Sequence, residues 1–123
     1  MSASRKHGPA LREFSKSAPV FAALGDRVRL EVVARLSQEG PLPTVELTRS
    51  ANLTRQGLTK HLNVLENAGL VVSERLGRDR LWRLQTRELA AARERLDRIS
   101  REWDSRLERL KTFVEGTGSP EIR

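Results

Sequence analysis

Five polar side chains recur along one side of the segment between residues 54 and 68, and their types suit hydrogen bonding to nucleic acid. At 3.6 residues per turn, Arg55, Gln56, Thr59, Lys60 and Asn63 share one face of a helix. Guanidinium and amide groups can each make two hydrogen bonds to the edge of a base, whereas ammonium and hydroxyl groups suit phosphate oxygens. This combination is typical of a helix that contacts DNA.

The opposite face of the same segment is apolar. Leu58, Leu62 and Leu65 form a stripe at helical spacing, which predicts that they anchor the helix on a core. Gly69 provides the left-handed position at which such a helix ends, and the β-branched run that starts at Leu70 suits a strand. The chain is therefore predicted to pass from helix to strand within a few residues.

Capping and turn residues divide the preceding chain into three further helices. Ser17 is expected to cap a short helix that reaches residue 24, and Asp26 is expected to cap a longer one that reaches residue 37. Glycine and proline at residues 40–43 end the longer helix, and Thr44 caps a third one that reaches residue 51. With residues 54–68, this third helix predicts a helix-turn-helix.

A hairpin is predicted next, with strands at residues 70–75 and 80–84. Gly77 lies in the turn between them and permits the positive φ that a tight hairpin turn requires. Arg78 and Arg80 lie at the tip, whereas Trp82 can pack inward from the base. A basic tip on an apolar base predicts a wing.

Apolar residues recur at steps of three and four from residue 87 to residue 114. The spacing predicts one helix with a coiled-coil-like seam, about 40 Å long at about 1.5 Å per residue. We expect a second copy of the chain to cover this seam; the alternative is that the helix folds back on its own domain. The seam consists of Leu89, Ala92, Leu96, Ile99, Trp103, Leu107, Leu110 and Val114.

The length of 123 residues suits one domain with a modest core. The expected fold class is mainly α with a small β-hairpin (α+β), a winged helix-turn-helix followed by a long C-terminal dimerisation helix. We predict a flexible basic arm at residues 1–16, the DNA-binding domain at residues 17–86, the dimerisation helix at residues 87–115 and a flexible tail at residues 116–123.

The formal net charge of +7 favours a polyanionic partner, and the charge is unevenly distributed. Residues 44–87 hold eight basic and four acidic side chains, a net charge of +4, whereas residues 88–115 are balanced. A membrane surface fits less well, because the long helix is neutral and no apolar run could cross a bilayer. The chain has no cysteine and no signal-peptide core, so we expect a soluble cytoplasmic protein.

No other chemistry is indicated by the sequence. A single histidine such as His61, at the edge of an apolar stripe, is more typical of a packed and hydrogen-bonded side chain than of a metal ligand. Serine, histidine and aspartate residues are scattered, and no glycine-rich phosphate loop occurs. We therefore expect no enzyme activity, no cofactor and no metal site. The sequence identifies no small-molecule inducer.

Three motifs, in this order, resemble the ArsR-type winged helix-turn-helix transcriptional repressors. The run Leu24–Leu30 resembles the family's opening, aLadptRl. Leu53–Val71 resembles its run LsqptvSrHLkvLreAGLV, and Gly77–Leu84 resembles its wing, GRrvyYrL. The resemblance covers residues 20–84, and the combination of motifs is more specific than any one of them.

The resemblance implies a homodimer, joined through its terminal helices, that places recognition helices in the major groove of a palindromic operator and represses transcription. Arg55 would read guanine and Gln56 adenine. The DNA-contacting helix matches at Thr54, Arg55, Gln56, Thr59, Lys60 and His61, and the wing at Arg78 and Arg80; Thr44, Thr59, Lys60 and both wing arginines are candidate phosphate contacts. The expected dimer interface consists of Leu89, Leu96, Ile99, Trp103, Leu107 and Leu110.

The chain departs from the metal-sensing members of this family. Where many of them carry a cysteine pair, it has Thr44–Leu47, and its last helix contains no histidine, so it resembles a cysteine-free branch without metal sensing. A second function stays open, that of a winged-helix protein-interaction module without specific DNA binding. Against this alternative, the polar face of residues 55–63 lacks the aromatic or aliphatic anchors that dominate protein interfaces.

Overall fold

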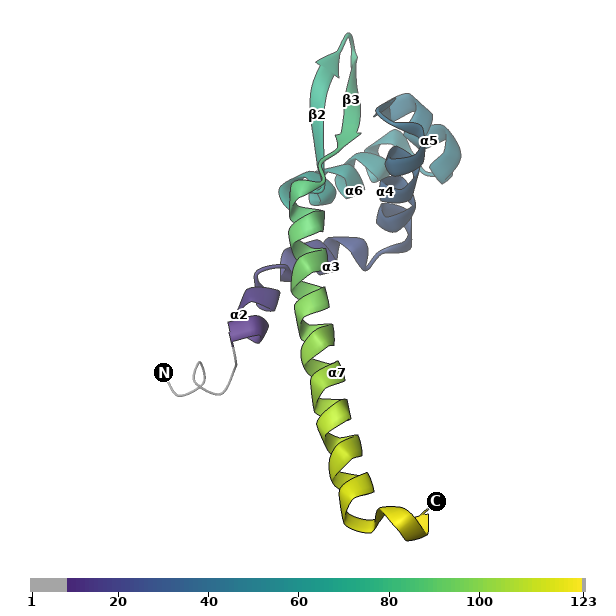
Figure 1. The fold of residues 1–123 in the computed structure, drawn as a ribbon. Helices are drawn as coiled ribbons and strands as arrows, with labels where there is room; N and C mark the ends of the chain where they lie inside the picture. Colours follow the sequence, from purple (N-terminus) through teal and green to yellow (C-terminus); the bar gives the residue numbers. More distant parts are fainter. Residues whose placement is uncertain (1–8, 123) are drawn as a thin grey trace.

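Short helices and a hairpin form a head at one end of a long helix, which is nearly straight for most of its length and turns sharply near its C-terminal end (Figure 1). The computed structural model describes the backbone of residues 9–122 and the side chains of residues 12–116. The wing projects from the head at the end opposite the C-terminus (Figure 1). In chain order the elements are α2 (Pro9–Ser15), α3 (Ala18–Leu24), α4 (Arg27–Glu39), β1 (Leu42–Pro43), α5 (Thr44–Ala51), α6 (Arg55–Asn67), β2 (Val71–Leu76), β3 (Asp79–Leu84) and α7 (Arg87–Ile122).

The head is held together by the apolar face of α6. Leu58, Leu62 and Leu65 are completely buried, which confirms the predicted stripe. Removing such side chains from water stabilises the fold by about 1.5–3 kcal/mol each. They share one core with residues of the other elements of the head, including Val20, Ala23, Val32, Val33, Leu36, Leu47, Leu70, Val71, Trp82 and Ala92.

The transition from α6 to the wing depends on Gly69, whose φ is +81°. A Cβ at this position would lie 2.8 Å from the Cγ atom of Glu88, in the first turn of α7. Glycine is therefore required both by the backbone conformation and by the close approach of α7. The sequence-based expectation that this residue ends the helix is confirmed.

The wing is part of a three-stranded antiparallel sheet with the order β1-β3-β2. Gly77 has φ +61° at the first central position of the two-residue turn, the position that a type II′ turn reserves for glycine. The short strand β1, which pairs Leu42 with Trp82, was not predicted, because two residues beside prolines carry no period-2 pattern. Pro43 has no amide hydrogen to donate, which suits an edge strand.

Of the three predicted helix caps, Asp26 makes its capping bond, whereas Ser17 and Thr44 do not; Thr54 makes a capping bond that was not predicted. Asp26 accepts a hydrogen bond from the amide of Arg29 at 3.0 Å, and Thr54 accepts one from the amide of Gly57 at 2.9 Å. Ser17 makes no capping bond; its buried hydroxyl instead accepts from the guanidinium of Arg95 at 2.9 Å. The cap prediction for Ser17 was wrong because a donor from a distant helix reaches the hydroxyl.

Both ends that were predicted to be flexible contain helix where the structure describes them. Pro9–Ser15 form α2, which lies against α7, where Glu13 approaches Arg95 at 3.9 Å. The ring centroids of Phe14 and Phe21 lie 5.3 Å apart, so an apolar contact also orders this segment. At the other end α7 continues to Ile122, beyond residue 115, where the helix was predicted to end. Residues 1–8 and 123, also assigned to the ends, lie outside the described residues.

Two threonines in α5 allow a matched test of this core. Thr44→Val should lower the free energy of unfolding by about 1–3 kcal/mol, because it leaves the buried indole N–H of Trp82 without an acceptor. That N–H now donates to the Thr44 hydroxyl at 2.8 Å. The hydroxyl of Thr48 is buried without a hydrogen-bond partner among the described residues, so Thr48→Val should be neutral or stabilising. Urea unfolding at one protein concentration measures both, and equal effects of the two changes would contradict this account.

Candidate nucleic-acid interface

The outer face of α6 is polar and accessible. Arg55, Gln56, Lys60 and Asn63 are exposed, directly opposite the buried leucines of the same helix. Within residues 12–116, the side chains of Gln56 and Lys60 have no hydrogen-bond or ion-pair partner. Both groups are thus free to bind an external ligand, as the sequence pattern predicts.

Three other predicted contact residues on this helix already have partners. Thr54 caps the helix, and the Thr59 hydroxyl donates to the carbonyl of Arg55 at 2.7 Å. His61 is only 24% exposed, and its Nδ1 atom lies 3.0 Å from Nη1 of Arg29 on α4. Because a guanidinium can only donate, Nδ1 is the acceptor, which leaves Nε2 as the one ring nitrogen for an outside contact.

Thr44 does not belong to this surface, contrary to the sequence-based expectation. Its side chain is only 3% exposed, and its hydroxyl accepts from the indole of Trp82. It is the first residue of α5, and Pro43 takes the N-cap position. The prediction of a cap and a phosphate contact was wrong because β1 and β3 enclose this residue, which the local sequence does not reveal.

Besides the two predicted arginines, Arg75 and Arg83 of the wing are also exposed. Arg78 is exposed in the turn, and Arg80 is exposed at the start of β3, where its Nε donates to Ser73 at 2.9 Å. The sheet register pairs Arg80 directly with Arg75, which the sequence analysis did not select. Like charges directly opposite each other are destabilising, so this pair favours an anion beside it. Only the strand register could have identified Arg75.

Asp79 joins the wing to both helices of the helix-turn-helix. Its Oδ1 atom accepts from Nη2 of Arg55 at 2.8 Å and from the amide of Arg80 at 2.7 Å. Its Oδ2 atom accepts from the amide of Val45, in the first turn of α5, at 3.1 Å. The sequence does not reveal this role, since Arg55 and Val45 lie 24 and 34 residues away in the chain.

The surroundings of Asp79 keep it ionised. Burial opposes ionisation of the carboxyl, but the nearby Thr44 hydroxyl and the hydrogen bonds from the amides of Arg80 and Val45 outweigh burial, and the charge of Arg55 adds to them. The pKa of Asp79 is therefore lowered from its ordinary value. The Arg55–Asp79 ion pair is present at neutral pH and is lost only as the pH falls through the lowered pKa.

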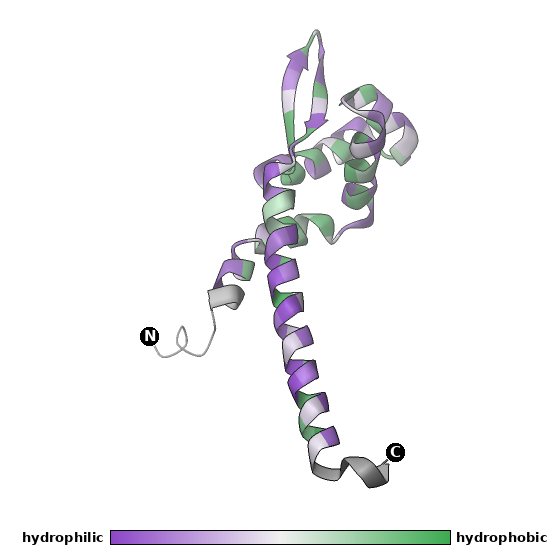
Figure 2. Cartoon of the chain, in the orientation of Figure 1, coloured by the Kyte–Doolittle hydropathy of each residue, from purple (hydrophilic) through white to green (hydrophobic). Residues whose placement is uncertain are grey.

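The proximal part of α7 packs against the head, whereas the hydrophobic side chains of its distal part are largely exposed. Ala92 is buried and Leu89, which is partly buried, packs against the core. Beyond them, hydrophobic positions recur along the projecting half of the helix (Figure 2). Leu96, Trp103, Leu107 and Leu110 are exposed and Ile99 is half-buried, so the distal helix does not fold back on its own domain.

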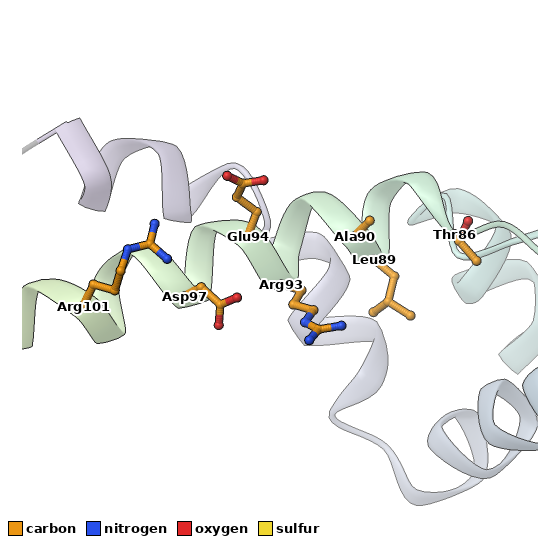
Figure 3. Close-up of a pocket in the computed structure, with 7 residues that line it drawn as sticks. All are labelled: Thr86, Leu89, Ala90, Arg93, Glu94, Asp97 and Arg101. Atoms are coloured by element: carbon orange, nitrogen blue, oxygen red, sulfur yellow. The ribbon is translucent and has the colours of Figure 1, made fainter. Parts of the chain in front are cut away.

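A shallow groove of about 650 Å³ follows the first turns of α7 (Figure 3). All its lining side chains come from this helix or from Thr86 just before it, and they alternate basic and acidic groups such as Arg93 and Asp97. No other described element closes the groove, so it is an open face of α7 and not an enclosed ligand site. Its lining residues are Thr86, Leu89, Ala90, Arg93, Glu94, Asp97 and Arg101.

The described part of the chain shows neither a metal site nor a membrane span. Among the side chains of residues 12–116, no three of histidine, cysteine, aspartate or glutamate gather closely enough to hold a metal ion. No helix within residues 9–122 is long and apolar enough to span a bilayer.

A helix-turn-helix with an exposed polar recognition face and a basic hairpin beside it defines a winged helix-turn-helix domain. Comparison with known proteins identifies the family. A helix-turn-helix domain family matches residues 24–74. The chain belongs to the ArsR-type winged helix-turn-helix transcriptional regulators and is a DNA-binding transcriptional regulator.

Three similar proteins support this assignment. The uncharacterised HTH-type transcriptional regulator YuzN of Bacillus subtilis is 43% identical over 68 residues, which cover 50% of this chain and 74% of YuzN. The HTH-type transcriptional regulator Rv2034 of Mycobacterium tuberculosis is 35% identical over 98 residues, 80% of this chain and 88% of the relative. The structure of an ArsR-like transcriptional regulator from Rhodococcus sp. RHA1 has a TM-score of 0.71 and 36% identity, covering 81% of this chain and 93% of that one.

Proposed function

We propose that two copies of this chain bind a palindromic operator together and repress the transcription of the gene beside it. The observation that carries the proposal is the arrangement of α6, which buries one face completely and leaves Gln56 and Lys60 exposed and unpartnered among the described residues. A helix of this kind suits insertion into the major groove. Repression then needs no further activity, because an occupied operator excludes other proteins from the same DNA.

Within this proposal, the polar residues divide between base contacts and phosphate contacts. Arg55 and Gln56 lie in the first turn of α6, from which recognition helices contact base edges, and their side chains suit guanine and adenine. Lys60 is positioned one turn later and suits a phosphate, as do the wing arginines Arg78 and Arg80. Thr54, Thr59 and His61 would add phosphate contacts through the atoms that their internal partners leave free.

The second copy is proposed from the exposed seam of α7. Trp103 is 56% exposed, and Leu107 and Leu110 are exposed on the same side of the helix. Burying such a side chain completely stabilises an association by about 1.5–3 kcal/mol, which favours a partner with the same seam. The proposed contacts are Leu96, Ile99, Trp103, Leu107 and Leu110. The proposed regulator acts in the cytoplasm by binding alone, without catalysis, cofactor or metal.

Selection of bound sites from a random duplex library tests this function. We expect a palindrome whose half-site centres lie about 10–10.5 base pairs apart, or a multiple of that distance, because each recognition helix enters one turn of the major groove. Enrichment of a single asymmetric site would contradict the dimer. No enrichment at all would contradict base reading and would favour the protein-interaction alternative.

A further inference from the structure

Asp79 is an acidic residue in the middle of a basic surface. Its carboxylate accepts from Arg55, Arg80 and Val45, which belong to α6, β3 and α5. A negative charge here weakens attraction to a polyanion, since binding strength depends on the phosphates that the protein neutralises. Affinity for DNA therefore does not explain the position of this residue.

The carboxylate is itself held in a rigid position. The amide of Val45 is one of the donors that the first turn of α5 leaves unpaired, and Pro43 at the N-cap offers no side-chain acceptor. Oδ2 of Asp79 satisfies that amide at 3.1 Å, while Oδ1 binds the amide at the start of its own strand at 2.7 Å. Two backbone donors thus fix the carboxylate relative to both α5 and the wing.

The fixed carboxylate in turn holds Arg55. The side chain of Arg55 is 54% exposed and that of Asp79 only 19%, so the arginine reaches from the surface to a partly buried anchor. Only Nη2 of Arg55 is engaged, at 2.8 Å. A guanidinium has five N–H donors in a planar fork, so donors remain for a second planar acceptor. An arginine without such an ion pair would lose more conformational entropy on binding DNA than Arg55, which Asp79 already orders.

We propose that Asp79 is a positioning residue for base recognition, which holds the Arg55 guanidinium in the orientation that reads its base pair. This inference rests on the proposed function, in which Arg55 contacts a base. The acidic group lowers general affinity for DNA and raises discrimination between sequences. It also couples the wing to the recognition helix, because the same carboxylate binds both.

Three variants separate the charge of Asp79 from its position. Asp79→Asn removes the charge, so affinity for random duplex should rise a few-fold. The ratio of the affinity for the operator to the affinity for random duplex should fall about tenfold. The lost discrimination should be at the same base pair at which Arg55→Ala loses its base preference. Asp79→Glu keeps the charge but moves the carboxylate. The affinity for random duplex should therefore stay unchanged, while the ratio of operator affinity to random-duplex affinity falls. Glu74→Gln is the matched control, since Glu74 is an exposed wing acid paired with Arg83 at 3.3 Å.

Binding is measured with the full chain on the selected operator, on operators changed one base pair at a time, and on random duplex, with urea unfolding as a check of folding. Glu74→Gln should raise both affinities equally and leave the ratio unchanged. Combining Asp79→Asn with Arg55→Ala should lower the ratio no further than Arg55→Ala alone. If Asp79→Asn and Asp79→Glu retain the ratio while Arg55→Ala loses it, the inference is wrong and the proposed function stands. If Arg55→Ala also retains the ratio, base reading by Arg55 fails and the inference fails with it.

Discussion

Replacing Trp103 and Leu107 together by glutamate should convert the dimer into monomers and lower operator affinity at least about a hundredfold, the gain that linking two half-site contacts typically provides. Both side chains are exposed on one side of α7 in the single chain. In the proposed dimer, the variant would place four carboxylates in an apolar seam, where charges without partners are strongly unfavourable. Light scattering coupled to gel filtration measures the mass, and a gel shift measures the affinity.

The matched control for this prediction is Ser105→Glu combined with Thr112→Glu. These two positions lie on the opposite side of the same helix, at the helical spacing of one face, so the control adds the same charge away from the seam. It should remain dimeric. A dimeric Trp103→Glu, Leu107→Glu variant would place the interface elsewhere, and a monomer with full operator affinity would show that one half-site is sufficient.

Arg55→Ala and Gln56→Ala should each reduce discrimination at one base pair of the half-site by about 1–3 kcal/mol, which is the contribution of a good bidentate contact. Both side chains are exposed in the first turn of α6. The measurement compares binding to the selected operator with binding to every single-base-pair change in one half-site. Each variant should become indifferent to a different base pair.

Wing variants give the contrasting result that makes this prediction specific. Arg78→Ala and Arg80→Ala should weaken binding to operator and random duplex alike, and should reduce the dependence of log affinity on log salt concentration by about one unit each. Arg78 is in the turn and has no hydrogen-bond or ion-pair partner to lose among residues 12–116, so its removal should not disturb the fold. Unchanged base preference in both α6 variants, or altered base preference in the wing variants, would reverse the assigned roles.

Much of the helical scaffold is predictable because its signals are local. The buried face of α6 follows from the spacing of Leu58, Leu62 and Leu65, and the start of α4 follows from the capping carboxylate of Asp26. The wing follows from Gly77, since few residues adopt its φ of +61°. In each case the interacting residues are within one or two helical turns or within one hairpin turn, so their order in the chain specifies their geometry.

The polar details of the site are different, because their partners come from distant parts of the chain. Thr44 lies 38 residues from the indole that occupies its hydroxyl, and Arg55 lies 24 residues from the carboxylate that holds it. Ser17 meets a guanidinium 78 residues away. A side chain whose chemical group could cap a helix or bind a phosphate hydrogen-bonds to whichever partner the folded chain brings within reach. Residue type and spacing are therefore sufficient for the helices, the wing and the exposed recognition face, whereas packing of the elements selects the polar groups that stay free to bind DNA.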